Sequence, residues 1–540
     1  MKIFLQNSKF CSFLLFFLII TTVKAQKHQE RYNAIDVKHY KFEFQLSDVS
    51  DEIKARATIQ IRFKKKLSTF ALDLLKKNDE GRGMQVITVF ENENRLNYMH
   101  DEDQLIFNID PVSENEIRTY QIDYKGIPAD GLIISKNKYG ERTFFGDNWP
   151  DRGKNWLPIV DHPSDKATVE WVITAPAHYQ TIGNGVVIEK TNLSNSETLT
   201  RWRMTDPIPT KVMVMGAARF AVEEQGETYG VPVSTWVYPQ DRDKGFDDYA
   251  LATPIIDYFI NHIGPYPFRK LANVQSKTRF GGMENAGNIF YSENSVTGTG
   301  SSEGLIAHEV AHQWFGNSAS EINWHHIWLS EGFATYFTNL YMEHKYGRDE
   351  LIERAKTQRK QIVDYAKENA VPIVNTKIED YMRLLNPNSY QKGGWVLHML
   401  RKKLGDKIFW KGIQSYYKKF KYSNALSEDL KAVMEEVSGK DLNSFFKQWL
   451  YQAGHPQLKI AWKYEKGSLI LEIDQIQKQK IFEFPLEIEI IFKDGSKTKK
   501  TIEVLSKNEK MKLPVDRQIN EINIDPEVWL LHELISLEKG

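Results

Sequence analysis

The chain has 540 residues but a single cysteine, Cys11, which lies within the first 25 residues. A mature protein without that segment has no thiol and no disulfide, so its stability must come from the size of its core. Lys and Arg number 71, and Asp and Glu also number 71, so no basic excess marks a nucleic-acid-binding protein. The mean hydropathy of −0.49 and the interspersed charges exclude a polytopic membrane protein.

Long apolar runs are also scarce, and the one near the N-terminus has the pattern of an export signal. Lys2 and Lys9 precede the apolar run 10–20, and the small residues up to Ala25 suit signal peptidase. Because the run is too short for a comfortable membrane span and no second run follows, we expect a signal peptide (1–25) cleaved near Ala25 and no stable membrane span. Export without cystine fits a periplasmic or secreted bacterial protein better than an animal ectodomain.

Length and periodicity divide the rest of the chain into three predicted domains. Alternation of apolar and polar residues up to about position 224 predicts a large antiparallel β domain (26–231). The period then becomes helical and predicts a mainly helical domain (232–455) with short strands at 271–275 and 288–291. Alternation returns in 456–540 and predicts a small β-sandwich. We expect helices at 246–263, 303–314, 331–346, 349–368, 392–404, 407–420 and 427–437.

The most informative motif is His308-Glu309-Val310-Ala311-His312, with Glu331 on the next predicted helix. Residues four apart lie on one face of a helix, so His308 and His312 can direct their rings at one ion. Catalytic zinc takes three protein ligands and leaves one position for water. We therefore expect one zinc ion per chain on His308, His312 and Glu331, with Glu309 as general base. Core histidines in a helical bundle without metal are the less favoured alternative, because three ligands and a base coincide.

The neighbourhood of this motif is apolar and contains two further polar features. Ser330 precedes Glu331 and is a candidate cap for the second helix, and two antiparallel helices would then close the site. His325 and His326 form an additional histidine pair. Because three zinc ligands are already assigned, we interpret this pair as packing or supporting residues and not as a second metal site.

Three stretches resemble, in order and spacing, the aminopeptidase N type of zinc metallopeptidase, a family that includes the leukotriene-hydrolysing aminopeptidases. They are 281–285, 308–317 with 328–334, and 389–393. The resemblance implies an α+β multidomain protein with an N-terminal β saddle domain beside a thermolysin-like catalytic domain. It also implies hydrolysis of N-terminal residues from peptides with a free N-terminus. Relatives commonly continue into a large C-terminal helical domain; we expect none here, and hence a more open cleft.

The same resemblance implies roles for residues outside the zinc motif. In the family a glutamate in a G-x-M-E-N strand binds the free α-amino group of the substrate, and Glu284 matches it. The rest of that substrate-binding segment is Gly281, Gly282, Met283 and Asn285. Tyr390 matches a tyrosine that hydrogen-bonds the oxyanion, although from the residues alone it reads as a packed tyrosine at the head of a helix. A second residue of the amine pocket corresponds to one of three positions, Asp147, Asn148 or Trp149.

Two other functions compete with that of a zinc aminopeptidase. Epoxide hydrolysis, as in the leukotriene-hydrolysing branch, uses an acidic and a tyrosine residue just before the Tyr390 motif, where this chain has Met382 and Leu385. A non-catalytic peptide-binding protein on the same fold would have lost zinc ligands, and none is missing here. The sequence thus predicts an exported zinc aminopeptidase and makes no prediction of its oligomeric state or side-chain preference.

Overall fold

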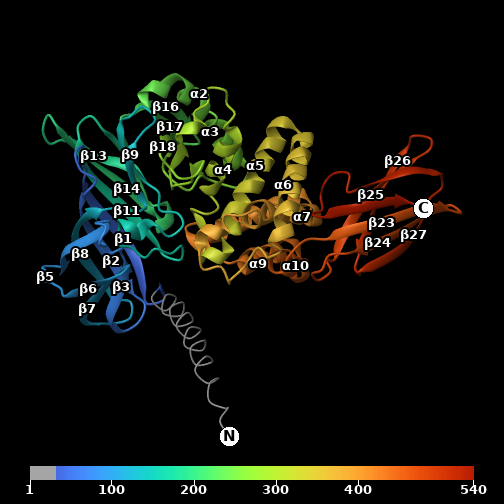
Figure 1. Cartoon of the computed structure of the whole chain (residues 1–540), viewed down its shortest axis with the longest axis horizontal. Coiled ribbons are helices and arrows are strands. Elements are labelled where there is room, and N and C mark those ends of the chain that lie inside the picture. The colour runs from blue at the N-terminus through green and yellow to red at the C-terminus, as the bar shows by residue number, and fades with distance from the viewer. Residues whose placement is uncertain (1–31) are drawn as a thin grey trace, which may run out of the picture. The chain divides into compact units, whose positions relative to one another are not determined.

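The structure is a computed structural model that describes residues 32–540; the predicted signal peptide (1–25) lies outside the described residues. The chain divides into two compact units, and Figure 1 labels the helices and strands that form them. The first contains the residues up to Gly226 together with Val231–Phe246 and Phe268–Val296. The second contains Glu227–Gly230, Asp247–Pro267 and Thr297–Gly540. The domain boundaries at 231/232 and 455/456 stay predictions.

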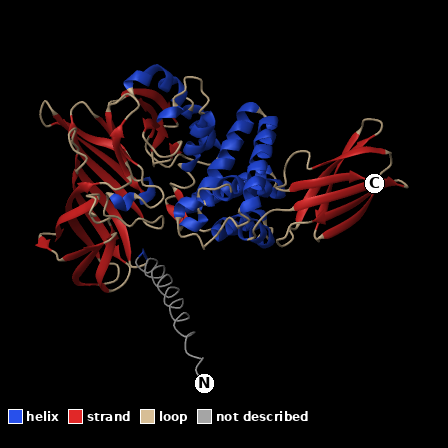
Figure 2. Cartoon of the chain, viewed as in Figure 1, coloured by secondary structure: helices blue, strands red, loops and turns tan. Residues whose placement is uncertain are grey.

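The first unit is built mainly of strands, as the alternation predicts (Figure 2). Its strands up to position 218 are β1 (Ile35–Gln45), β2 (Ile53–Phe63), β3 (Leu67–Asp73), β4 (Gly83–Glu91), β5 (Asn94–Arg95), β6 (Tyr98–Asp101), β7 (Gln104–Val112), β8 (Ile117–Ile127), β9 (Leu132–Lys136), β10 (Arg142–Gly146), β11 (Lys166–Pro176), β12 (Gln180–Gly183), β13 (Val186–Asn192), β14 (Glu197–Pro209) and β15 (Met215–Ala218). They form an eight-stranded sheet of order β13-β14-β11-β1-β2-β8-β4-β5, a four-stranded sheet β12-β15-β10-β9 and a three-stranded sheet β3-β7-β6.

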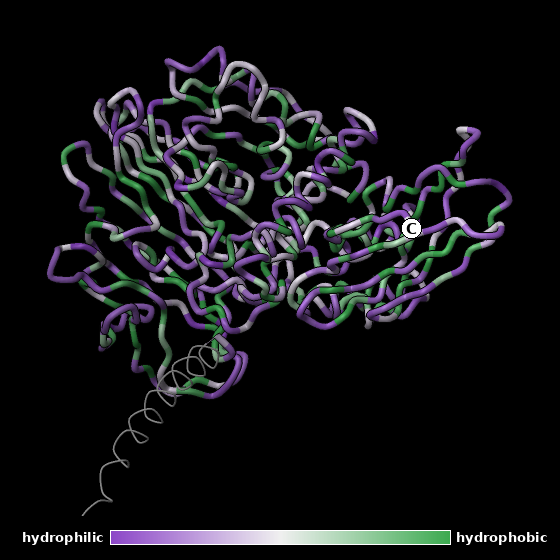
Figure 3. Tube along the Cα trace, turned by 45° about the vertical axis from the view of Figure 1, so that its right-hand side comes forward, coloured by the Kyte–Doolittle hydropathy of each residue, from purple (hydrophilic) through white to green (hydrophobic). Residues whose placement is uncertain are grey.

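The largest sheet differs from the prediction in one pairing. Strand β1 runs parallel to β11, with Phe42 opposite Trp171, so the sheet is mixed and not wholly antiparallel. A register shift between Val37 and His39 marks a bulge in β1. Odd-numbered residues face the core before the bulge, and even-numbered residues face it afterwards. Val37 is buried before it, and Tyr40 and Phe42 are buried after it. Figure 3 shows hydrophobic and hydrophilic residues alternating along the trace.

A five-stranded sheet completes the first unit, in the order β16-β17-β18-β20-β19. Its strands are β16 (Ala221–Thr228), β17 (Val231–Val237), β18 (Leu271–Ser276), β19 (Gly282–Met283) and β20 (Asn288–Ser292). The two short strands predicted at 271–275 and 288–291 are therefore confirmed as β18 and β20. The short strand β19 lies at the edge of this sheet and pairs antiparallel with β20.

Helices dominate residues 242–451. They are α2 (Arg242–Tyr249), α3 (Ala252–His262), α4 (Glu303–His312), α5 (Trp328–Tyr346), α6 (Arg348–Glu368), α7 (Gly393–Leu404), α8 (Asp406–Phe420), α9 (Ser427–Ser438) and α10 (Asn443–Tyr451), with the short parallel strands β21 (Ala319–Glu321) and β22 (Ser423–Ala425) between them. The single helix predicted at 246–263 is wrong. Pro254 lacks an amide proton and tolerates a place only in the first turn of a helix, so the chain ends α2 and begins α3 just before it. Helix α10 was not predicted.

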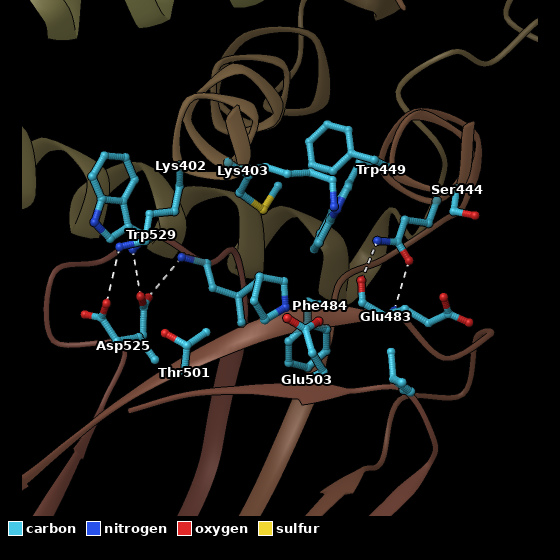
Figure 4. A pocket seen from close by; sticks show the side chains of 17 residues that line it. Lys402, Lys403, Ser444, Trp449, Glu483, Phe484, Thr501, Glu503, Asp525 and Trp529 are labelled. Atoms are coloured by element: carbon cyan, nitrogen blue, oxygen red, sulfur yellow. Dashed lines mark hydrogen bonds and ion pairs between the residues drawn. The ribbon is translucent and has the colours of Figure 1, made fainter. Parts of the chain in front are cut away.

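The C-terminal strands form two sheets, of order β27-β24-β23-β29 and β26-β25-β28. Their bounds are β23 (Gln457–Glu465), β24 (Ser468–Gln475), β25 (Phe484–Phe492), β26 (Lys497–Val504), β27 (Asn508–Pro514), β28 (Ile519–Ile524) and β29 (Glu533–Lys539). Figure 4 shows where β25 and β26 face α7 and α10, around a cavity of about 260 Å³. Lys402 of α7 and Glu487 of β25 form an ion pair of 3.2 Å there. Within residues 32–540, no helix has the length and apolar character needed to cross a membrane.

Candidate metal centre

Two buried helices of the second unit carry the predicted zinc ligands. Helix α4 ends at His312, and its residues Ile306 and Val310 are completely buried. Helix α5 is buried along its whole first part, from Trp328 through Met342, as expected for a helix that is covered on all sides. The motif residues 308–312 and Glu331 therefore lie on two elements that a well-packed core holds in place.

The three predicted ligands converge on one point. The Nε2 atoms of His308 and His312 are 3.1 Å apart, and Oε2 of Glu331 lies 3.4 Å from the first and 3.3 Å from the second. Zinc with ligands at about 2.0 to 2.1 Å in a tetrahedron separates neighbouring ligand atoms by about 3.3 to 3.4 Å. The spacing and the donor set of two imidazoles and one carboxylate therefore fit a zinc ion.

Burial and charge both favour ligation at this point. The side chains of His312 and Glu331 are 2% and 5% exposed, whereas that of His308 is 18% exposed. Burial alone raises the pKa of the Glu331 carboxyl, but the adjacent His312 and His308 rings outweigh it and lower that pKa well below its usual range. The carboxylate is thus held as an anion, which is the form that binds a metal. The greater exposure of His308 marks the side of the site that is open to a ligand.

Ser330 has a different role from the one predicted. Helix α5 begins at Trp328 with Ile327 as its cap, so Ser330 lies inside the first turn. Its hydroxyl lies 3.0 Å from Nδ1 of His312, and the Phe315 carbonyl lies 3.2 Å from the same nitrogen. A partner on Nδ1 fixes the ring and directs Nε2 at a metal.

Gly316 leaves the space that this contact needs. Its φ is +114°, and a Cβ built there would come within 2.2 Å of the Ser330 hydroxyl. Any other residue would strain the backbone and displace the Ser330 side chain. The sequence analysis did not predict the contact between Ser330 and His312. Gly316, shortly after His312, is the sequence feature that accompanies this contact.

Glu309 and Tyr390 are the candidates for chemistry beside the ligands. Glu309 lies on α4 between the two histidines and is 5% exposed. Tyr390 belongs to a π-helical turn (Asn388–Lys392) that leads into α7, and π-helical turns are frequent at functional sites. Its ring stacks on His308 with 6.0 Å between centroids and an interplanar angle of 13°. The structure therefore brings Tyr390, which lies far along the sequence, next to a zinc ligand.

A glycine contact holds this turn against the helix that carries Glu331. A Cβ built on Gly332 of α5 would lie 2.8 Å from the carbonyl carbon of Gly393, the first residue of α7. The two backbones therefore approach as closely as only glycine allows. Because Gly332 follows Glu331 directly, the position of Tyr390 is tied to that of the carboxylate ligand.

The histidine pair before α5 has its own partners. Nδ1 of His326 lies 2.8 Å from the Ser427 hydroxyl, and Nε2 of His325 lies 2.9 Å from the Ile378 carbonyl. In the described part of the chain, neither histidine belongs to a group of three metal-binding side chains. These hydrogen-bond partners give both rings a place in the packing, and the absence of a second metal site stays a prediction.

The predicted amine-binding segment lies in the first unit, whereas the zinc ligands lie in the second. Gly282 and Met283 form the edge strand β19, and the Gly281 carbonyl accepts a hydrogen bond of 2.9 Å from Ser292. Glu284 and Asn285 follow directly and are 5% and 0% exposed. The edge strand and the buried carboxylate have the form that the resemblance implies, and the role of Glu284 in binding an amine stays a prediction.

The three candidates for a second amine-pocket residue also lie in the first unit. Asp147 forms an ion pair of 2.6 Å with Arg152, and burial raises the pKa of its carboxyl in spite of that partner. The Asn148 amide donates to two backbone carbonyls and accepts from the Trp156 indole at 2.8 Å. Trp149 packs edge-on against Phe280 at 5.9 Å, next to the G-x-M-E-N segment. Asp147 also accepts a hydrogen bond of 3.0 Å from the Arg279 backbone amide, so Asp147 and Trp149 both contact residues just before this segment. The identity of the second amine-pocket residue stays a prediction.

Comparison with known proteins identifies one family for two long stretches of the chain. A model of the peptidase family M1 domain matches residues 249–449, and a model of the peptidase M1 N-terminal domain matches residues 36–212. The chain belongs to the peptidase M1 family. The resemblance to aminopeptidase N type zinc metallopeptidases is thereby confirmed, and the zinc motif and Tyr390 both fall within the matched catalytic domain.

Named relatives in the M1 family are aminopeptidases. The chain is 26% identical over 421 residues to glutamyl aminopeptidase of Bitis rhinoceros, covering 71% of this chain and 44% of the relative. It is 27% identical over 427 residues to probable aminopeptidase 2 of Sulfurisphaera tokodaii, covering 75% and 53%. Aminopeptidase M1 of Arabidopsis thaliana is 26% identical over 339 residues, covering 60% and 38%. The chain spans about half the length or less of these relatives.

Proposed function

We propose that this chain is a zinc-dependent aminopeptidase that hydrolyses N-terminal residues from peptides with a free N-terminus. The observation that carries the proposal is the convergence of three donor atoms from His308, His312 and Glu331 at spacings that suit tetrahedral zinc. Membership of the peptidase M1 family and the names of its relatives support the same reaction class.

Each residue near the donors has a task in this proposal. A zinc ion on the three donors would polarise the scissile carbonyl and acidify a water molecule. The Glu309 carboxylate accepts the proton of the attacking water and delivers it to the leaving amine. The Tyr390 hydroxyl donates a hydrogen bond to the carbonyl oxygen as negative charge develops on it. Stacking of Tyr390 on His308 at 6.0 Å supports its assignment to this oxygen.

Glu284 supplies the preference for a free N-terminus in this proposal. A buried carboxylate gains a charge-assisted hydrogen bond when the substrate ammonium arrives, and an acetylated terminus offers no such charge. Glu284 is 5% exposed and follows an edge strand, which supports the proposal because such a strand can pair with extended peptide.

The decisive experiment uses a panel of aminoacyl fluorogenic substrates together with matched free and N-acetylated peptides. We expect hydrolysis of free N-termini, loss of activity with a chelator, recovery with zinc, and far slower cleavage of acetylated peptides. Glu284→Ala should weaken only the free-amine substrates. Equal cleavage of free and acetylated peptides at internal bonds would identify an endopeptidase, and zinc binding without any turnover would identify a peptide-binding protein.

We also propose that the enzyme is exported and that residues 456–540 form a separate β-sandwich domain. Export is supported by the basic and apolar pattern of residues 1–25 and by the absence of cysteine after Cys11. The sandwich is supported by the two C-terminal sheets. Detection of the processed protein in the periplasm or medium of an expressing bacterium, with a new N-terminus near Gln26, tests the first proposal.

A further inference from the structure

Lys392 is the most unusual charged residue near the metal centre, because it is 1% exposed at the end of the turn that carries Tyr390. Its Nζ donates a hydrogen bond of 2.8 Å to the carbonyl of Gly454, 62 residues further along the chain. Among the described residues, no carboxylate oxygen lies within ion-pairing distance of this Nζ. A buried ammonium without an anionic partner is energetically unfavourable, and burial lowers the pKa of Lys392 to about 7.

Packing alone does not explain a lysine at this position. A methionine side chain fills nearly the same volume without the energetic cost of burying an amine. The other ionisable groups around Gly454 do not neutralise Lys392 either. His455 is buried, and burial followed by the Lys392 charge lowers the pKa of its ring to about 4, while its Nε2 lies 3.6 Å from Glu533. What the lysine uniquely provides is a donor that reaches the Gly454 carbonyl.

The hydrogen bond joins two parts of the second unit. Gly454 lies between α10 (Asn443–Tyr451) and β23 (Gln457–Glu465), where the chain passes from the helices to the C-terminal strands. Gly393, the residue that follows the turn, closely approaches Gly332 of α5. The π-helical turn is therefore clamped between the helix of Glu331 and the start of the C-terminal strands.

We propose that Lys392 is a positioning residue for Tyr390, which acts by fixing the π-helical turn to the Gly454 carbonyl. This inference rests on the proposed function, because it presumes that the Tyr390 hydroxyl stabilises the oxyanion. In this inference Lys392 acts through the turn and not by direct contact with substrate or metal. Since the hydroxyl is needed in the transition state and not for binding the ground state, loss of the clamp lowers kcat and leaves KM unchanged.

The test is a double-mutant cycle between Lys392→Met and Tyr390→Phe, with zinc content and thermal stability measured for every variant. Tyr390→Phe should lower kcat by about 10² to 10³ fold, the usual effect of removing one oxyanion donor. Lys392→Met should lower kcat by at least about tenfold in the wild-type background. In the Tyr390→Phe background it should have almost no further effect, because the group that it positions is gone.

Gly454→Ala tests the same contact from the acceptor side. Gly454 has a φ of +79°, which strains an alanine, while the space around it is open down to 3.4 Å from the Gln479 side chain. The backbone should shift its carbonyl away from Lys392 and lower kcat in the same way. Lys403→Met, on the exposed face of α7, is the matched control and should keep wild-type kcat.

The outcomes separate this inference from the proposed function. Wild-type kcat in folded, zinc-loaded Lys392→Met and Gly454→Ala overturns the positioning role. Multiplicative losses in the double variant also overturn it, because they show that Lys392 acts independently of Tyr390. If Tyr390→Phe keeps full activity while Lys392→Met does not, the oxyanion role of Tyr390 is what fails. Should Lys392→Met not fold, Gly454→Ala alone in the two Tyr390 backgrounds decides the question.

Discussion

Two sets of histidines in the second unit differ in what surrounds their nitrogens. At the metal centre, His308 and His312 direct Nε2 atoms at each other and at Glu331. Elsewhere, His398 uses both ring nitrogens within the fold: Nδ1 lies 3.1 Å from the Tyr336 hydroxyl and Nε2 lies 2.9 Å from the Val528 carbonyl.

Electrostatics separates the two sets further. Burial lowers the pKa values of His398 and His532 to about 3, so both rings stay neutral over the usual pH range. His532 has the Asp525 carboxylate 3.9 Å from its Nδ1, whereas Nε2 of His312 lies 3.3 Å from Glu331 and 3.1 Å from a second histidine nitrogen. Burial of a histidine is therefore no sign of a metal site. The sign is convergence of its nitrogen with other donors, together with a partner such as Ser330 on the opposite nitrogen.

Removal of a zinc ligand gives the largest expected effect. His308→Ala should abolish stoichiometric zinc binding and reduce activity to the level measured with a chelator, because two remaining donors hold zinc poorly. His325→Ala is the control, since that ring contacts the Ile378 carbonyl and not the centre. Metal analysis of both purified variants checks the prediction, and a zinc-loaded, active His308→Ala protein would contradict the assignment.

Removal of the general base comes next. Glu309→Gln should keep zinc and lower kcat by about 10² to 10⁴ fold. Glu303→Gln, on the same helix, is the matched control: Glu303 accepts a 3.0 Å hydrogen bond from the Tyr341 hydroxyl, so its loss should affect thermal stability and not kcat. Single-turnover kinetics with saturating zinc distinguishes the two. Turnover by Glu309→Gln near the wild-type rate would rule out the proposed role.

The contact behind His312 predicts a smaller effect. Ser330→Ala should weaken zinc binding by about 10 to 100 fold, because His312 then loses a partner that orients its ring. Thr338→Ala on the same helix removes a buried hydroxyl that donates a hydrogen bond to the Ala334 carbonyl, and it should leave zinc affinity unchanged. Competition with a metal-binding dye measures both, and equal affinities would show that the Phe315 carbonyl alone orients the ring.

Local periodicity explains why the zinc ligands could be predicted from sequence. His308 and His312 are related by one helical turn, and the helices at 303–314 and 331–346 correspond to α4 and α5 with small shifts at their ends. Ser330 was misassigned because a serine near a helix start has two uses, and capping is the commoner one. Nothing local distinguishes a serine that bonds a histidine from one that caps.

Contacts between distant segments were beyond the sequence pattern. The parallel pairing of β1 with β11 joins strands with nine others between them in the chain, and alternation does not specify a partner. Tyr390 became a candidate only through family resemblance, since a tyrosine at the head of a helix is ordinarily packed. The hydrogen bond from Lys392 to Gly454 has no local sequence signal. Most lysines are exposed, and the residues around Lys392 in the sequence do not show that this one is buried.

The smallest expected effect concerns His398 and sharpens the contrast with the metal centre. Its folded pKa of about 3 lies below the unfolded value of about 6.5. Its stabilising contribution is therefore fully present above pH 6.5 and is lost as the pH falls toward 3, by about 1.4 kcal/mol per pH unit.

His398→Phe should flatten the dependence of unfolding free energy on pH between 4 and 6 by about that slope. It also removes the two hydrogen bonds of the ring, so at pH 7 the variant should be less stable by about 1 to 3 kcal/mol. Zinc content and kcat should stay at wild-type values. Urea unfolding of the chelated proteins at several pH values makes the comparison, because the zinc-site histidines titrate equally in both. An unchanged slope would show that His398 is protonated in the folded state, and a loss of zinc would show that the two sets of histidines are not independent.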